Sequence, residues 1–187
     1  DERVGITEVP MGQIQAQFDR NLLRNLVTSQ YVALFNALIL SGLLLISVTG
    51  VHILFWMVSL LGLTGMRLYL AKTLQRKNRG LQSGEKLSLD GLGFAAGLLW
   101  GLTPFLAGAD ALGMKLELIT FMLAGMTAGA AVAFAAHIRS VLAFNTPALS
   151  VFGLYLVMAG TVQSYAMCAV LALYFVALGV VGAAGQK

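Results

Sequence analysis

Residues 116–137, LELITFMLAGMTAGAAVAFAAH, contain a single carboxylate near their start and no other formally charged side chain. As an α-helix this stretch is about 33 Å long, which is enough to cross the roughly 30 Å hydrocarbon core of a bilayer. Its apolar residues are continuous and do not alternate with polar ones, as they would in a membrane barrel strand. The stretch therefore predicts a membrane-spanning helix.

The rest of the chain repeats this pattern. Of the 187 residues, 58% are hydrophobic and only 11% are charged, whereas soluble domains carry about 25% charged residues. The charges gather in short clusters between long apolar runs. We therefore predict an all-α integral membrane bundle of six helices. The expected spans lie at about residues 27–48, 53–73, 89–108, 116–137, 141–160 and 165–185.

The region before the first span, residues 1–26, is more polar. Between residues 11 and 26, apolar side chains recur every four positions and predict one face of an amphipathic helix. That face is formed by Ile14, Phe18, Leu22 and Leu26, and the opposite face by Gln13, Gln15, Gln17, Asp19 and Arg20. The helix can lie in the membrane interface with Arg20 and Arg24 among the headgroups, or it can be a helical lead-in to the first span.

Lysine and arginine are distributed unequally between the two predicted sides of the membrane. One side holds Arg3, Arg20, Arg24, Arg67, Lys72, Arg76, Lys77, Arg79, Lys86, Arg139 and Lys187, and the other holds Lys115. Because positive loops stay in the cytoplasm, this asymmetry predicts that both termini are cytoplasmic. We expect a multi-pass protein of the bacterial inner membrane.

Glycines recur at four-residue spacing in the third and fourth spans. They are Gly93, Gly97 and Gly101 in the third span and Gly125 and Gly129 in the fourth. Small residues at this spacing form a groove that lets helix backbones approach closely. Since a short loop joins these two spans, we expect them to pack on each other; alternatively, one groove is a dimer face.

Four residues in the outer halves of the spans are candidate ligand contacts. They are Trp56, Trp100, Pro104 and Thr120. A proline inside a span frees a backbone carbonyl and can kink the helix, so these residues can line a pocket for a hydrophobic small molecule, open to the outer leaflet. The alternative is that the tryptophans are ordinary interfacial anchors.

Ionisable residues inside spans usually mark transport pathways. Here Arg67 lies about two turns inside the second span, and we expect its side chain to extend outward to the basic side. The other ionisable residues near the spans, Asp90, Asp110, Glu117 and Arg139, fall at span ends. The near absence of ionisable residues within the spans makes a transport function less favoured.

Metal, cofactor and nucleic-acid functions find no support in the sequence. The two histidines, His52 and His137, fall at opposite ends of spans, about 25–30 Å apart, so they cannot share a haem or a metal. The methionines and the single cysteine, Cys168, are interpreted as packing residues. No catalytic arrangement is visible, so we expect the chain itself to carry no catalysis.

The stretch from Gly97 to Tyr155 resembles the six-helix N-terminal membrane sensor regions of bacterial signalling proteins. The resemblance rests on the Trp100-Gly101 pair, on the small-residue run at 124–130, and on Asn145-Thr146-Pro147-Ala148. It implies a homodimer and a soluble output domain after Lys187. The full-length protein would then be a histidine kinase or a cyclic-di-GMP cyclase or phosphodiesterase of the GGDEF and EAL type, which helix repacking controls.

Two other functions stay open. The segment GLLWGLTPF at 97–105 also resembles a repeated segment of drug/metabolite exporters, which would make the chain a small transporter or half-transporter. The third possibility is a membrane anchor that dimerises an output domain. An open reading frame that continues past Lys187 would favour the sensor or the anchor over the transporter.

Overall fold

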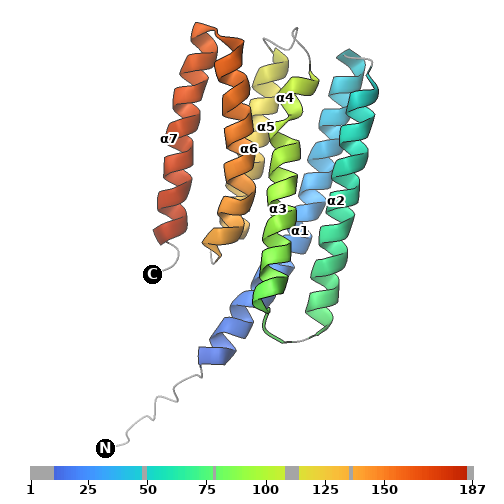
Figure 1. Cartoon of the computed structure of the whole chain (residues 1–187), viewed down its shortest axis with the longest axis vertical. Helices are drawn as coiled ribbons and strands as arrows, with labels where there is room; N and C mark the ends of the chain where they lie inside the picture. Colours follow the sequence, from blue (N-terminus) through green and yellow to red (C-terminus); the bar gives the residue numbers. More distant parts are fainter. Residues whose placement is uncertain (1–10, 48–49, 78, 108–113, 135–136, 185–187) are drawn as a thin grey trace, which may run out of the picture.

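The structure is a computed structural model that describes residues 11–47, 50–77, 79–107, 114–134 and 137–184. All regular structure in these ranges is helical (Figure 1). The helices are α1 (Met11–Ser47), α2 (Val51–Arg76), α3 (Ser83–Gly101), α4 (Thr103–Leu106), α5 (Met114–Ala133), α6 (Ile138–Ala159) and α7 (Val162–Ala184). Residues 1–10 of the predicted N-terminal region, residues 48, 108, 135–136 and 185 of the predicted spans, and Asp110 lie outside the described residues.

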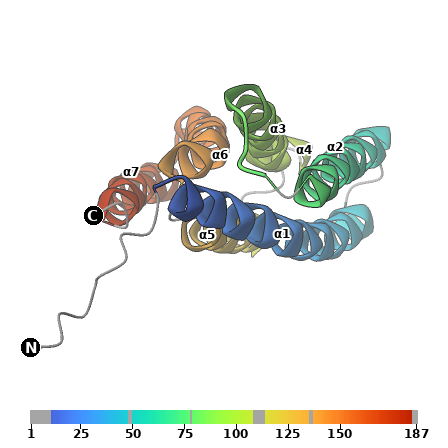
Figure 2. The ribbon, with the colours of Figure 1, turned by 90° about the horizontal axis from the view of Figure 1, so that it is seen from below.

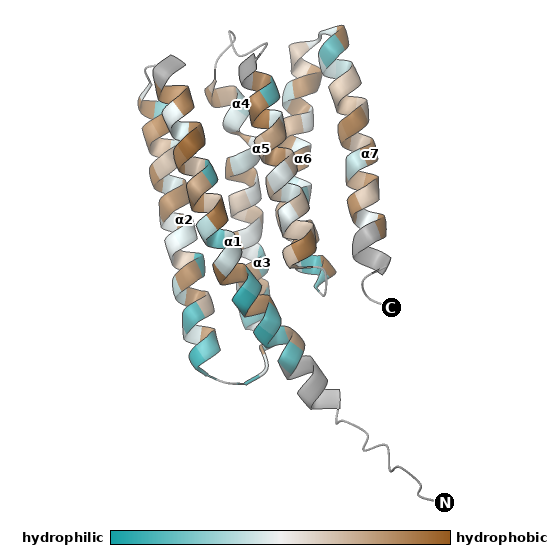
Figure 3. Cartoon of the chain, turned by 180° about the vertical axis from the view of Figure 1, so that it is seen from behind, coloured by the Kyte–Doolittle hydropathy of each residue, from teal (hydrophilic) through white to brown (hydrophobic). Residues whose placement is uncertain are grey.

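Six segments are long and apolar enough to cross a membrane. They are Gln17–Leu45, Val51–Arg76, Ser83–Leu106, Leu116–Ala133, Ile138–Ala159 and Val162–Val180. The predicted all-helical fold and the number of long apolar helices are therefore confirmed. Figure 3 shows that hydrophobic residues cover much of these helices, with the hydrophilic residues gathered mainly at one end. These features support a multi-pass membrane protein.

The first helix does not stop where the amphipathic segment was expected to end. Helix α1 runs unbroken from Met11 to Ser47, as the lead-in alternative would have it. Leu22 and Leu26 of the predicted apolar face are buried, but the assignment was wrong for Asp19, which is 1% exposed, and for Phe18, which is 46% exposed. Asp19 is buried because it has partners there: its carboxylate pairs with Lys86 Nζ at 2.9 Å and accepts the Leu81 N–H at 2.9 Å.

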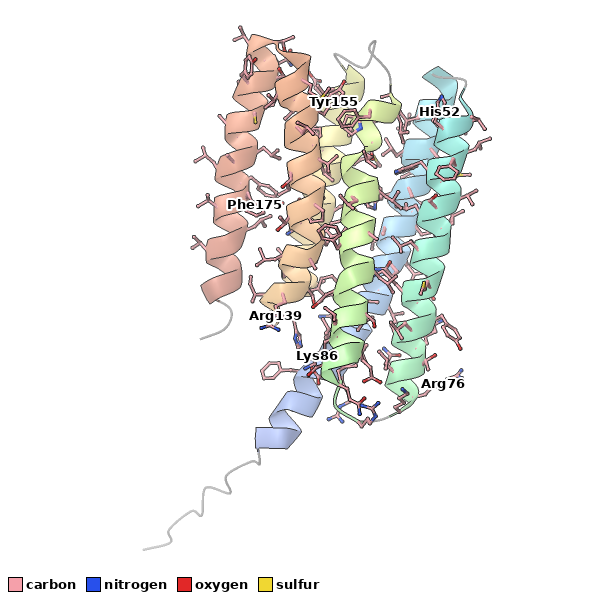
Figure 4. The ribbon with its side chains drawn as sticks, in the orientation of Figure 1. His52, Arg76, Lys86, Arg139, Tyr155 and Phe175 are labelled. Carbon is pink, nitrogen blue, oxygen red and sulfur yellow. The ribbon has the colours of Figure 1, made fainter. Side chains whose placement is uncertain are left out.

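The helices form two layers (Figure 2). Helices α2, α3 and α6 lie side by side in one layer, α1 and α5 lie against them in the other, and α7 stands at the edge beside α6. Arg76, Lys86 and Arg139 lie at one end of the bundle, which we call the basic end, and His52 and Tyr155 lie at the opposite end (Figure 4). The start of α1 and the end of α7 both lie toward the basic end.

The closest helix contact is between α3 and α6, not between α3 and α5 as predicted. A methyl group added at Gly101 would lie 2.7 Å from the Ala148 carbonyl oxygen, and one at Gly97 would collide with the Phe144 carbonyl and the Pro147 ring. Two glycines of α3 thus let the backbones of α3 and α6 meet. The short α3–α5 connection did not decide the partner, because α6 fits this groove and fills it.

Pro104 lies in the first turn of the short helix α4, which follows the end of α3 at Gly101. Its missing N–H leaves the Trp100 carbonyl without its intrahelical donor. The Thr103 hydroxyl donates to that carbonyl at 2.6 Å, so the break costs no unsatisfied polar group. The expected interruption at Pro104 is therefore present, as a short turn that still counts within one apolar segment.

The α6–α7 turn is sharp. Gly160 ends α6 with φ of 65°, a left-handed conformation that glycine adopts at little cost. Thr161 and Ser164 then cap α7 reciprocally, each side chain accepting the other's backbone N–H at 3.0 and 2.9 Å. Helix α7 nevertheless remains peripheral. Only 6% of the most apolar stretch of α7 is buried inside the protein, against 28–44% of the corresponding stretches in the other five segments.

Candidate functional site

A cavity of about 640 Å³ lies between the two layers. Residues of α1, α2, α3, α5 and α6 line it. It extends from Trp100 of α3 toward the basic end. Its exposed lining residues Val32 of α1 and Val132 of α5 are 54% and 79% accessible, so the cavity opens sideways between these two helices.

One wall of the cavity is the small-residue stripe of α5. Gly125, Ala128, Gly129, Ala130 and Ala133 all line it. A methyl group added at Gly125 or Gly129 would meet nothing within 4 Å. Within the described chain, these two glycines therefore leave space instead of packing against a helix, which differs from the role expected for them.

Two asparagines of α1 hold α5 at either end of this wall. Asn25 Nδ2 donates to the Ala133 carbonyl at 2.9 Å, and Asn36 Nδ2 contacts Met126 Sδ at 3.1 Å. The two asparagines are about 16 Å apart along α1. They join α1 to α5 without closing the space between them, so the cavity is braced at both ends.

Arg67 lies on the cavity side of α2, with only 7% of its surface exposed. The expectation that it extends outward was therefore wrong. The buried residues of α2 explain why, because Trp56, Leu60, Thr64 and Arg67 follow one another at four- and three-residue steps. That spacing places Arg67 on the same face as Trp56, a signal that the sequence contained and that the outward interpretation missed.

The structure brings together two of the four predicted ligand contacts. Trp100 lines the cavity, and Trp56 packs edge-on against it with ring centroids 5.7 Å apart. The Trp56 indole N–H donates to the Leu99 carbonyl at 2.7 Å, which fixes the Trp56 ring against α3. Pro104 is buried at the α3–α4 break, and the Thr120 hydroxyl bonds back to the Leu116 carbonyl at 2.6 Å. A ligand role for these four residues stays a prediction.

The same segment of α5 that borders the cavity bonds to α6 and α7 on its other side. The Thr127 hydroxyl lies 3.0 Å from the Tyr174 hydroxyl, and Tyr174 donates to the Ala124 carbonyl at 2.9 Å. Asn145 Nδ2 donates to the Thr127 carbonyl at 3.3 Å. The sequence indicated that Asn145 caps its helix or bonds to another helix, and the bond to α5 is present, whereas Tyr174 was not singled out. One turn of α5 thus contacts the cavity and the peripheral helix together.

Charged residues at the basic end form ion pairs with one another. Glu85 pairs with Arg79 at 2.8 Å and with Lys77 at 3.1 Å, and its carboxylate also accepts the Gln82 N–H. Asp19 lies 3.8 Å from His137 Nε2 as well as beside Lys86. These contacts join α1, α3, the α2–α3 loop and the start of α6. Among the described residues, no group of three or more metal-ligating side chains is present.

Comparison with protein-family models, with curated proteins and with solved structures finds no match to this chain.

Proposed function

We propose that this chain is the transmembrane input module of a bacterial signalling protein, of the histidine kinase or cyclic-di-GMP type. In this proposal the basic end faces the cytoplasm, as the positive-inside rule favours, and the module works as a homodimer in the inner membrane. The cavity receives a ligand, and the ligand changes how α7 packs against α5 and α6. An output domain that follows α7 responds to this change.

One observation carries the proposal. A single turn of α5 borders the cavity through Met126 and Ala128 and contacts α7 through the hydroxyl of Thr127, the residue between them. A ligand that displaces this turn must therefore also disturb the contact with Tyr174 of α7. Because α7 is buried far less than the other five long helices, moving it disturbs less buried surface than moving any of them.

The energies involved are compatible with signalling. Coupling between two sites in a protein amounts to about 1–3 kcal/mol. A hydrogen bond such as that of Tyr174 contributes about 1 kcal/mol. Loss or gain of one or two bonds in this cluster is therefore enough to shift a two-state equilibrium, provided that the ligand binds the two states unequally.

The sequence of the gene gives the first test. The open reading frame is expected to continue past the codon for Lys187 into a kinase or cyclic-di-GMP output domain. A stop codon at that point would contradict the proposal. With the full-length protein in hand, output is measured for the wild type and for Tyr174→Phe in membranes, and the variant is expected to respond less to the same stimulus.

A transporter is the rival that the cavity itself favours, since solute carriers also hold a substrate pocket near the middle of the bilayer. Reconstitution into liposomes separates the two. The sensor proposal expects that amphiphilic and small organic solutes cross no faster than through protein-free liposomes. Saturable flux that Trp100→Ala abolishes would favour transport.

A further inference from the structure

Arg67 is a buried cation. Its side chain makes no hydrogen bond or ion pair within the described residues, and its Nε atom is fully enclosed. Asp90 of α3 attracts the guanidinium electrostatically, but the two form no ion pair, and Asp90 Oδ1 accepts the Ser140 hydroxyl at 2.7 Å. Enclosing a charge without a partner is costly, and such residues in membrane helices commonly mark functional sites.

The fold makes room for this guanidinium. A methyl group at Gly93 of α3 would lie 3.5 Å from one of its terminal nitrogens, so a larger residue there would crowd it. Arg67 also lies nine residues before Arg76 on α2, about 14 Å along the helix axis. Its backbone therefore lies well inside the bundle, and its buried side chain lines the cavity.

The cavity lining changes in polarity along its length. Toward the basic end, polar side chains of α1 and α2 face apolar residues such as Ala133 and Phe134, whereas toward Trp100 the lining includes Leu60, Ala96 and Trp100. The polar lining residues are Asn25, Thr28, Ser29, Gln30, Thr64 and Arg67. A ligand that matches this lining has one polar, negatively charged end and one apolar end.

The volume of the cavity and the position of its opening further restrict the class of ligand. A volume of about 640 Å³ lies within the roughly 300–1,000 Å³ of pockets for drug-sized ligands, which suits one apolar chain. The sideways opening at Val32 and Val132 lets a molecule enter from the bilayer. Gly93, beside Arg67, and Trp100 are seven residues apart on α3, about 10 Å along the axis, so a chain whose head contacts Arg67 reaches the tryptophan pair.

We propose that the cavity binds a single-chain amphiphile with an anionic head group, a carboxylate or a phosphate, which pairs with Arg67 while its chain lies along α3 and α5 toward Trp100. This names the ligand class of the proposed sensor and rests on that proposal for its signalling role. Binding itself is measured separately from output, so failure of one is distinguishable from failure of the other.

The test uses the purified chain in nanodiscs of phosphatidylcholine, which has no net charge, with ω-bromoundecanoate as the probe. Bromine at the end of the chain quenches tryptophan fluorescence at close range, so binding is expected to give saturable quenching that unbrominated undecanoate reverses. The methyl ester of the probe lacks the charge. The ester is expected to bind at least about tenfold more weakly than the acid, because it cannot form a charge-assisted hydrogen bond with Arg67, and such bonds are stronger than neutral ones.

Arg67→Gln is expected to weaken binding of the acid about tenfold or more and to leave binding of the ester unchanged. Arg76→Gln is the matched control, because it removes an exposed charge from the same helix outside the cavity, and it should bind the acid as the wild type does. Equal affinity of the wild type for acid and ester, or an Arg67→Gln variant that binds the acid normally, would overturn the proposal.

Two further variants keep the test independent of how well Arg67→Gln folds. Gly129→Leu fills the cavity from α5 and is expected to abolish saturable quenching. Gly62→Leu adds the same group on the outside of α2, where nothing lies within 4 Å, and should have no effect. Retained binding in Gly129→Leu would place the ligand elsewhere and contradict the site.

A last arm distinguishes the two sources of the anion. Lysophosphatidic acid and undecanoate are compared as competitors, and the assay is repeated in nanodiscs that contain phosphatidylglycerol. Stronger competition by undecanoate, with no effect of phosphatidylglycerol, would assign a free carboxylate; stronger competition by lysophosphatidic acid, or occupation in phosphatidylglycerol nanodiscs, would assign a lipid phosphate. If neither anion competes, the proposal is wrong.

Binding and output are separate results. Binding as expected without any change in output would support the ligand site and contradict the signalling function.

Discussion

Helices α3 and α5 carry the same small-residue spacing but use it in opposite ways. On α3, Gly97 and Gly101 touch the backbone of α6, and any added side chain would collide with it. On α5, Gly125 and Gly129 leave open space that belongs to the cavity. The comparison shows that a stripe of small residues allows another group to approach the helix backbone closely. The stripe does not specify whether that group is a second helix or a ligand.

The physical difference lies in the helix opposite. Pro147 and the Phe144 carbonyl of α6 form a ridge that enters the α3 groove. Opposite the α5 stripe stands α1, which Asn25 and Asn36 hold at two points about 16 Å apart. Because those bonds lie at the ends of the wall, the middle stays open. Four substitutions test this contrast, in order of the effect expected on stability.

Gly97→Leu should have the largest effect. Its side chain would have to displace the Phe144 carbonyl and the Pro147 ring, and overpacking of this kind costs about 3 kcal/mol. Thermal unfolding of the purified chain in detergent, followed by helical circular dichroism, is expected to show a large fall in Tm or loss of folded protein. Gly129→Leu is the matched control on α5. Equal destabilisation of the two variants would contradict the contrast between the stripes.

Gly101→Ala should have an intermediate effect. The added methyl group lies 2.7 Å from the Ala148 carbonyl oxygen and 2.9 Å from Val151 Cβ, so α6 must shift by a few tenths of an ångström. We expect a loss of about 1–2 kcal/mol, measured as a fall in Tm in the same assay. An unchanged Tm would mean that α3 and α6 are less tightly packed than the structure has them.

Tyr174→Phe should cost less, about 0.6–1 kcal/mol, because it removes one hydroxyl from the cluster with Thr127 and Ala124. It tests the far side of the α5 stripe. In the full-length protein the variant is expected to bind the amphiphile normally while its output responds less. Phe175→Leu, which changes the neighbouring position on α7 and no hydrogen bond of this cluster, is the control. Normal output in Tyr174→Phe would mean that the cluster only holds α7 in place.

Gly129→Ala should have the smallest effect, within about 0.5 kcal/mol of the wild type, because the new methyl group meets nothing within 4 Å. This variant also addresses the alternative that the α5 stripe is a dimer face. If a second copy packs there, the methyl group should weaken dimerisation, as seen by chemical cross-linking in membranes. Unchanged cross-linking together with unchanged Tm would leave the cavity as the use of this stripe.

Much of the fold was predictable because the signals are local. Each span is recognisable from the length and hydropathy of its own residues, and Pro104 interrupts the third span because it lacks a backbone N–H. The site was predictable only in part. Trp100 was chosen and does line the cavity, whereas Trp56, Pro104 and Thr120 lie outside its lining.

Asp19 and Arg67 show why the remainder failed. Each was assigned to a polar or outward environment by its charge, and each is buried. For Asp19 the reason is a set of partners far along the chain, Leu81 and Lys86. No sequence pattern near Asp19 indicates these partners. For Arg67 the helical period with Trp56 and Leu60 indicated the inner face, but charge alone pointed the other way.

The sequence by itself determined that the chain is helical, that six segments can cross a membrane, and that the basic residues gather at one end, since hydropathy, length and charge depend on composition along the chain. Only the tertiary structure decided which small-residue stripe is filled and which is left open. That choice depends on the shape and the bonds of the opposing helix, here the α6 ridge against α3 and the two α1 asparagines against α5. Neither is encoded in the stripes, which have the same spacing.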